Sequence, residues 1–188
     1  MADVKKGIIL KGIGGLYFVE TADTVFECKA RGIFRKSGQK PLVGDEVDIL
    51  IGEDGANNTI EKIYPCRSDL MRPPVANLDR LFILSSVRDP NPSTLIIDKM
   101  TAIACWKNIE PVIVITKDDL GDTSELRGIY EKAGIPFFSV SSRDGRGADE
   151  VKAMLSGHIS AFAGNTGVGK SSLLNLIAPE LSLKTGEI

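Results

Sequence analysis

The strongest constraint on the fold is a glycine-rich run near the end of the sequence. Residues 164–171 have the sequence GNTGVGKS and fit the pattern G-x-x-x-x-G-K-[ST]. In such a loop the glycines let several backbone N–H groups point at one centre, and the following helix N-terminus favours anions, so the loop holds phosphate groups. The pattern needs a strand before it and a helix after it. Both are expected, because residues 159–163 are strand-like and a helical pattern begins near Gly169.

Upstream of this loop, strand-like and helix-like segments alternate. Buried strands are expected over 81–87, 112–115, 136–140 and 159–163. Helices are expected over 94–106, 124–133 and 148–155. This order predicts a parallel sheet covered by helices on both faces. Because parallel strands end at the same edge of a sheet, the residues that follow different strands are expected to meet there.

The first third of the chain has a different pattern. Five short strand-like runs are separated by turn residues, at 8–10, 16–19, 25–28, 47–51 and 60–64. This count predicts a small barrel; an OB-fold fits it, and so do other small barrels. A proline-containing stretch then suggests a linker. The predicted domains are therefore an OB-fold-like β-barrel over 1–66, a linker over 67–77 and an α/β domain over 78–188.

A second motif follows the strand expected at 112–115. Residues 116–119 have the sequence TKDD and the form [NT]-K-x-D. Asp119 can accept two hydrogen bonds from guanine, and adenine lacks that pair of donors, so a carboxylate here disfavours ATP. The aliphatic stem of Lys117 can cover the base. Alone this tetrapeptide is more typical of a solvated helix start, and it gains weight from the phosphate loop on the same sheet.

A third segment, residues 139–145 (SVSSRDG), follows the next expected strand. Backbone N–H groups near Ser141 and Ser142 can bind the guanine O6, although the segment alone resembles an ordinary polar loop. Both base motifs precede the phosphate loop, which is the reverse of their order in an ordinary P-loop GTPase. A circular permutation explains this order, because moving the termini leaves the edge of the sheet intact.

Together, these features closely resemble the ribosome small-subunit-dependent GTPase A family (RsgA, also called YjeQ or EngC). Residues 41–47 (PLVGDEV) resemble a family segment of the barrel, and 183–188 (LKTGEI) resemble the start of the first switch. Residues 116–119, 139–142 and 164–172 resemble the fourth, fifth and first GTPase motifs. The resemblance implies an N-terminal OB-fold followed by a circularly permuted P-loop GTPase domain.

By this resemblance, the implied activity is hydrolysis of GTP to GDP and phosphate, stimulated by the small (30S) ribosomal subunit during its late maturation. The implied cofactors are GTP or GDP and Mg²⁺, and the implied partners are the small subunit and its rRNA. The family's switch threonine, D-x-x-G motif and zinc ligands would lie beyond Ile188, so Zn²⁺ is expected only there. We therefore expect a truncated GTPase domain, incomplete at its C-terminus, that binds nucleotide but hydrolyses it poorly.

These motifs define the predicted nucleotide site. Lys170 is the expected catalytic residue, acting on the β and γ phosphates, and the Ser171 hydroxyl is the expected Mg²⁺ ligand. The expected phosphate-binding residues are Gly164, Asn165, Thr166, Gly167, Val168, Gly169, Lys170, Ser171 and Ser172. The expected guanine-binding residues are Thr116, Lys117, Asp119, Ser141 and Ser142.

Composition limits the other functions. A formal net charge of −2 gives no overall basic field, so any RNA contact needs a local patch. One candidate patch, equally typical of a solvated hairpin, contains Lys29, Arg31, Arg35, Lys36 and Lys40. The 3 cysteines are widely spaced and odd in number, which favours a reducing compartment. No apolar run is long enough to span a membrane. We expect a cytoplasmic protein that is a monomer.

Two other functions fit parts of the sequence. A P-loop ATPase or kinase would use the same phosphate loop, but Asp119 after a strand argues against adenine. Alternatively, the barrel is the working part, an RNA-binding module in which the nucleotide is only structural. Competition by ATP supports the first alternative, and RNA binding by the barrel without nucleotide supports the second.

Overall fold

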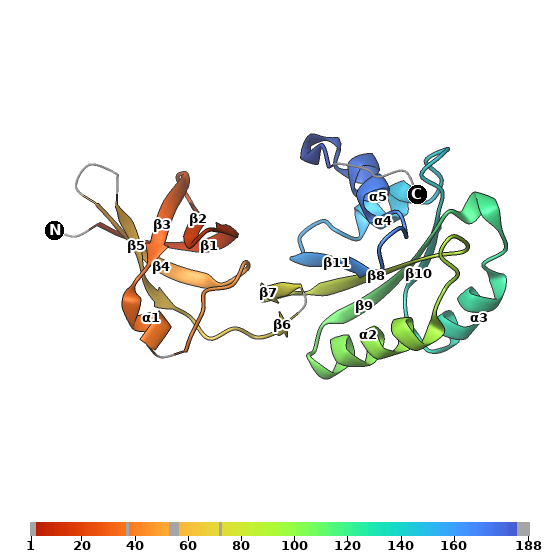
Figure 1. The fold of residues 1–188 in the computed structure, drawn as a ribbon, viewed down its shortest axis with the longest axis horizontal. Helices are drawn as coiled ribbons and strands as arrows, with labels where there is room; N and C mark the ends of the chain where they lie inside the picture. Colours follow the sequence, from red (N-terminus) through yellow and green to blue (C-terminus); the bar gives the residue numbers. More distant parts are fainter. Residues whose placement is uncertain (1–2, 37, 53–56, 72, 184–188) are drawn as a thin grey trace. The chain divides into compact units, whose positions relative to one another are not determined.

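The computed structural model describes residues 3–36, 38–52, 57–71 and 73–183. The chain divides into two compact units, Met1–Leu78 and Asp79–Ile188 (Figure 1). In the described part of the chain, no helix combines the length and the apolar composition needed to cross a lipid bilayer.

The first unit is a closed five-stranded barrel with the strand order β1-β2-β3-β5-β4. Its strands are β1 (Asp3–Ile13), β2 (Leu16–Thr21), β3 (Val25–Ala30), β4 (Glu46–Ile51) and β5 (Asn58–Ile63). The long β1 pairs with both β2 and β4, and the parallel pair β3–β5 closes the barrel. Alternate side chains point inward, so the core contains fully buried Ile9, Val19, Val47, Ile49 and Ile60. The predicted small barrel is confirmed.

A short helix, α1 (Gly32–Lys36), adds Phe34 to this core and was not expected from the sequence. The predicted linker contains a second unexpected element, the hairpin of β6 (Asp69–Met71) and β7 (Pro74–Ala76). This hairpin contacts the loop before β4, since the Ala76 N–H donates to the Val43 carbonyl at 2.8 Å. The Asn77 amide also donates to the Gly44 carbonyl at 2.9 Å. Residues 67–77 therefore pack against the barrel.

Gly44 is expected to be the most sensitive position of this contact. Its φ is +89°, and a Cβ there would lie 2.1 Å from the Ala76 carbonyl oxygen. Gly44→Ala should destabilise the first unit by about 3 kcal/mol, because strain and a backbone clash add. Hydrogen exchange of the barrel amides in urea measures this loss.

Gly14→Ala is the matched control for that substitution. Gly14 has a φ of +60°, but a Cβ there would meet no atom of the described residues within 4 Å. Strain alone should cost about 1 kcal/mol at this site. Equal losses for the two variants would mean that the hairpin does not pack closely against Gly44.

The second unit is an α/β domain with a parallel sheet of order β10-β9-β8-β11. Its strands are β8 (Arg80–Ser86), β9 (Glu110–Thr116), β10 (Phe137–Val140) and β11 (Ser160–Gly164). Its helices are α2 (Thr94–Trp106), α3 (Ser124–Lys132), α4 (Ala148–Ala153) and α5 (Lys170–Ile177), with 3₁₀ turns η1 (Asp118–Leu120) and η2 (Pro179–Leu181). The parallel sheet is confirmed, and the predicted elements end within a few residues of the observed ones.

Helices cover both faces of this sheet, as predicted (Figure 1). Helices α2 and α3 lie on one face, and α4 and α5 lie on the other. The core under α4 and α5 contains Phe82, Val114 and Leu173, each fully buried. Ile83 and Ile113 face the opposite way and are buried too. Burial on both faces explains why these strands are almost continuously apolar in the sequence.

Candidate functional site

Three loops at the carboxyl edge of the sheet carry the predicted site. The phosphate loop (residues 164–171) joins β11 to α5. The base motif (residues 116–119) follows β9, and the serine loop (residues 141–147) follows β10. Because β8 to β11 are parallel, all three loops lie at one edge, where ligands bind in open α/β sheets.

Glycines determine the shape of the phosphate loop. Gly167 and Gly169 have φ values of +81° and +85°, a region that side-chain-bearing residues rarely adopt. At Gly164 a Cβ would lie 2.4 Å from the Leu84 carbonyl oxygen of β8. Val168 is 2 % exposed and belongs to the core beneath the loop. Burial of Val168 and close backbone packing at Gly164 therefore hold the loop in place.

Lys170 lies across this loop. Its ammonium group donates to the carbonyls of Gly164 and Asn165, at 2.9 and 2.6 Å. Burial lowers the pKa of Lys170 from its ordinary value. Ser171 is half-buried in the first turn of α5, and its hydroxyl has no partner among the described residues. The lysine is thus held at the loop, and the serine oxygen is available to a ligand.

Thr116, which was predicted to bind guanine, has a buried side chain beside the phosphate loop. It is 1 % exposed, and its hydroxyl lies 2.5 Å from the Val168 carbonyl oxygen and 3.1 Å from that of Ser85. The single hydroxyl proton serves these two acceptors. The side chain therefore connects the base motif to the phosphate loop and to β8.

Removing this connection should affect both stability and nucleotide binding. In Thr116→Val the methyl groups still fill the space, but the Val168 carbonyl loses its donor. A buried carbonyl left without a donor costs about 1–3 kcal/mol. We expect a lower melting temperature of the second unit and weaker binding of fluorescent GDP.

Thr101→Val is the matched control for Thr116→Val. Thr101 is also buried, on α2, but its hydroxyl has no hydrogen-bond partner in the described part of the protein. The same substitution should be neutral or stabilising there. Similar losses at both positions would show that Thr116 contributes only by packing.

The other two residues of this motif that were predicted to bind guanine are more accessible. Lys117 adopts the left-handed conformation at φ +57°, and its ammonium group donates to the Asp89 carbonyl in the β8–α2 loop. Asp119 is exposed in η1. Within the described ranges, no side chain pairs with its carboxylate. Both carboxylate oxygens of Asp119 can therefore accept hydrogen bonds from a ligand.

The two serines predicted to bind the base differ in their surroundings within the serine loop. The Ser141 N–H already donates to the Arg146 carbonyl at 3.0 Å, and Ser141 is fully buried. Ser142 is exposed, and its N–H has no acceptor among the residues that the structure describes. Ser142 is therefore the better placed of the two to bind a base oxygen.

The predicted basic patch of the barrel is only partly available. Lys29 and Lys40 are exposed, whereas Arg31 forms an ion pair with Glu61 at 2.5 Å. The side chains of Arg35 and Lys36 lie outside the described residues. The sequence reading missed Lys11, which pairs across strands with Phe18 and lies 5.7 Å from the centre of its ring. The available signal was that Lys11 directly follows the strand predicted at 8–10, and that the next predicted strand, at 16–19, contains aromatic residues.

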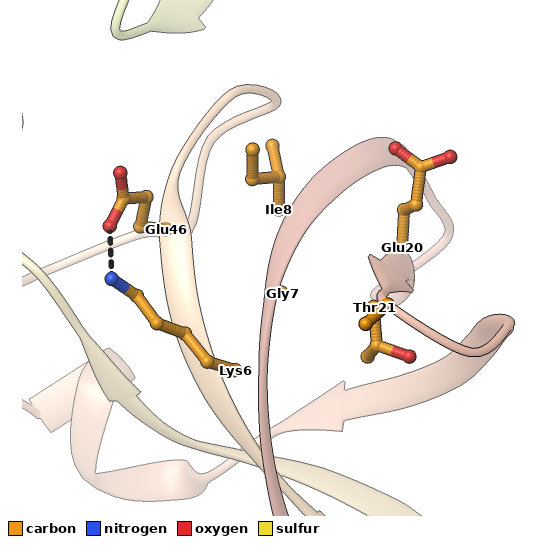
Figure 2. A pocket seen from close by; sticks show the side chains of 7 residues that line it. Lys6, Gly7, Ile8, Glu20, Thr21 and Glu46 are labelled. Carbon is orange, nitrogen blue, oxygen red and sulfur yellow. Dashed lines mark ion pairs between the residues drawn. The ribbon is translucent and has the colours of Figure 1, made fainter.

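A second surface of the barrel has the opposite character (Figure 2). A hollow of about 390 Å³ over β1 is lined by Glu20 and Glu46 on either side of Ile8. Lys6 forms an ion pair with Glu46 at 2.7 Å, which leaves Glu20 as the excess charge. Carboxylates repel phosphates, so this hollow does not suit an RNA backbone.

Metal ligands are sparse in the part of the chain that the structure describes. There, no group of three or more His, Cys, Asp or Glu side chains comes together to hold a metal ion. The three cysteines are free thiols; Cys28 is buried, and Cys66 and Cys105 are exposed. Burial raises the pKa of Cys28 to about 11.

Two protein-family models match the chain. The model described as RsgA GTPase matches residues 63–188, and the model described as RsgA N-terminal domain matches residues 6–60. Their boundary lies close to the end of the barrel, and the GTPase match contains all three loops of the site.

Curated relatives and solved structures resemble the chain over nearly its whole length. It is 43% identical to a small ribosomal subunit biogenesis GTPase RsgA from Alkaliphilus metalliredigens, over 98% of this chain and 65% of the relative. A protein of the same name from Caldanaerobacter subterraneus is 40% identical, over 97% of this chain and 63% of the relative. The chain thus spans less than two thirds of the length of these relatives.

Among solved structures, YjeQ from Thermotoga maritima matches with a TM-score of 0.82 and 37% identity, over 98% of this chain and 68% of that one. YloQ, described as a circularly permuted GTPase, matches with a TM-score of 0.78 and 32% identity, over 95% of this chain and 66% of that one. The permuted arrangement of YloQ agrees with the order of the base motif, the serine loop and the phosphate loop.

Proposed function

Because this chain belongs to the RsgA GTPase family, we propose that it binds guanine nucleotides at the three loops and that its protein hydrolyses GTP to GDP and phosphate. The proposed setting is biogenesis of the small ribosomal subunit in the cytoplasm, where the 30S subunit stimulates hydrolysis. The observation that carries the proposal is the Asp119 carboxylate, which no side chain of the described residues pairs with, at the same sheet edge as the phosphate loop, with Thr116 joining the two.

Each part of the nucleotide has a proposed partner. The phosphate-loop N–H groups and the Lys170 ammonium bind the β and γ phosphates. Asp119 accepts from the guanine N1–H and amino group, and the Ser142 N–H donates to O6. The stem of Lys117 covers the base. The ammonium groups of Lys117 and Lys170 already lie on backbone carbonyls at this edge, so they are close to their proposed positions.

The site also fits a magnesium ion. Mg²⁺ prefers oxygen ligands and usually keeps several waters, so one serine hydroxyl and two phosphate oxygens suit it. Ser171 supplies that hydroxyl beside the phosphate loop. When bound, the ion neutralises negative charge on the phosphates, and the chain's own contribution is to hold the phosphates in line. Because phosphoryl transfer depends on positioning and electrostatics, a partner that orders neighbouring segments can set the rate.

The proposed rRNA contact uses the barrel. Lys11, Lys29 and Lys40 are exposed, and no carboxylate of the described residues pairs with them. Phe18 lies beside Lys11 and offers part of a ring for base stacking. This surface, rather than the acidic hollow over β1, is the proposed contact with rRNA.

A competition titration tests guanine recognition. Fluorescent GDP is titrated with Mg²⁺ into wild type and Asp119→Ala, and unlabelled GTP and ATP compete for the site. We expect GTP to displace the probe, ATP to leave it bound, and Asp119→Ala to abolish binding. Asp149→Ala removes an exposed carboxylate from α4 and is the control, with unchanged binding expected. Equal displacement by ATP would leave a generic P-loop nucleotide-binding protein.

A further inference from the structure

One side chain joins the two loops that are proposed to hold the base. Arg146 lies in the serine loop, after β10, and its Nη1 is 3.1 Å from Oδ2 of Asp118 in the base motif, after β9. Its Nη2 is 3.2 Å from Oδ2 of Asp144, in its own loop. The two ends of the guanidinium therefore connect loops that follow different strands.

The backbone holds Arg146 in place for this contact. The Arg146 N–H donates to the Asp144 carboxylate at 3.1 Å, and the Arg146 carbonyl accepts from Ser141 at 3.0 Å. The next residue, Gly147, has a φ of +75°, and a Cβ there would lie 2.1 Å from the Ser139 carbonyl oxygen. The loop therefore packs directly against the end of β10. This packing fixes the backbone position from which the Arg146 side chain extends.

Asp118, the partner of Arg146 in the base motif, is also held in place. The Asp118 side chain is only 15% exposed, and Asp118 and Asp119 are neighbours in the 3₁₀ turn η1. A displacement of Asp118 therefore displaces Asp119. Hydrogen bonding to Asp144, together with the charges of Asp118 and Asp119, raises the pKa of Arg146, which remains charged.

We propose that Arg146 is a positioning residue for guanine: through Asp118, it fixes the separation between the Asp119 carboxylate and the Ser142 N–H. This inference rests on the proposed function of the site. A guanine offers N1–H and its amino group on one part of its edge and O6 on another, so both loops must be correctly spaced at once. Without Arg146 the spacing varies, and only a fraction of the molecules are ready to bind.

The expected signature is a change in base discrimination. Inosine diphosphate lacks the 2-amino group and so loses one of the two proposed hydrogen bonds to Asp119. Wild type should prefer GDP over inosine diphosphate. In Arg146→Ala, GDP affinity should fall by about fivefold, the size expected for exposed ion pairs. The preference for GDP over inosine diphosphate should fall by at least about twofold, because Asp119 is no longer fixed against the amino group.

The variants form a cycle around the Arg146–Asp118 pair. Asp118→Asn should weaken GDP binding as Arg146→Ala does, and the double variant should be no weaker than the weaker single variant. Arg146→Lys keeps the charge and should restore part of both the affinity and the discrimination. Lys152→Ala, an exposed lysine on α4, is the control and should change neither quantity. All affinities are measured by displacement of fluorescent GDP, with the melting temperature recorded alongside.

The outcomes separate this inference from the proposed function. If Arg146→Ala retains full GDP affinity, or loses GDP and inosine diphosphate equally with a lower melting temperature, the positioning role is wrong while the guanine site stands. Additive losses in the double variant would also overturn it. If Asp119→Ala binds GDP as tightly as wild type, the proposed function is wrong, and so is the proposed role of Arg146.

Discussion

Replacing Lys170 with alanine is expected to weaken GDP binding by about 100-fold or more, because two charge-assisted contacts with phosphate are lost together. The ammonium group lies on the carbonyls of Gly164 and Asn165, which keeps it at the phosphate loop before a phosphate arrives. The backbone N–H groups remain in the variant, so some phosphate binding should persist. Isothermal titration with GDP and Mg²⁺ measures the change.

The folded state should tolerate this substitution. Lys170→Ala removes two hydrogen bonds to loop carbonyls. It also removes a charge that burial disfavours, as the lowered pKa of Lys170 indicates, so the two effects oppose each other and the melting temperature should change little. Lys170→Arg keeps the charge but places a larger planar group in the loop, and it should not restore full affinity. A loss of less than about fivefold in Lys170→Ala would mean that the backbone alone holds the phosphates.

Replacing Asp119 with asparagine is expected to reverse the base preference from guanine to xanthine. Xanthine carries an oxygen where guanine carries its 2-amino group, so the wild-type carboxylate repels it. An asparagine amide can donate to that oxygen and still accept from N1–H. GDP affinity should fall by about 100-fold and xanthosine diphosphate should become the better ligand, because a mismatched polar pair at a base costs several kcal/mol. Displacement titrations with both nucleotides measure the reversal.

Asp118→Asn is the neighbouring control for this reversal. It makes the same chemical change one residue earlier, at a carboxylate that binds Arg146 rather than the proposed ligand. It should weaken GDP modestly without improving xanthosine diphosphate. If Asp119→Asn keeps its preference for GDP, the carboxylate does not contact the base edge and the assignment of residues 116–119 is wrong.

The sequence predicted the elements that depend on local pattern. Strands such as β8 and β9 are almost continuously apolar because both faces are buried, and their loops carry glycine or polar residues at defined positions. The hairpin β6–β7 was missed because its stabilising hydrogen bonds go to Val43 and Gly44, far away in the sequence, while its prolines suggested a linker. Pairings between distant segments have no signature in periodicity.

The contacts of side chains in the candidate site could not be predicted either, because they join residues far apart in the sequence. Spacing indicated that Thr116 belongs to a base motif, but its hydroxyl serves Val168, 52 residues away. Likewise, the Arg146–Asp118 ion pair joins residues 28 apart, and neither residue was expected to matter. In the barrel, Arg31 was expected to be free for RNA, but the pairing of distant strands places Glu61 beside it. Motifs predicted which loops form the candidate site, and tertiary contacts decided which of its groups remain available.

The pairing of β11 with β8 has a consequence for how the domain forms during translation. Ser160 lies opposite Arg80, so the strand that carries the phosphate loop must pair with a strand that was synthesised 80 residues earlier. The loops proposed to bind the base are therefore synthesised before the phosphate loop. Since a ligand stabilises only the state it binds, nucleotide can support this nascent domain only after β11 and α5 have been made. With the permuted order of motifs, stabilisation of the domain by bound nucleotide thus becomes possible only late in its synthesis.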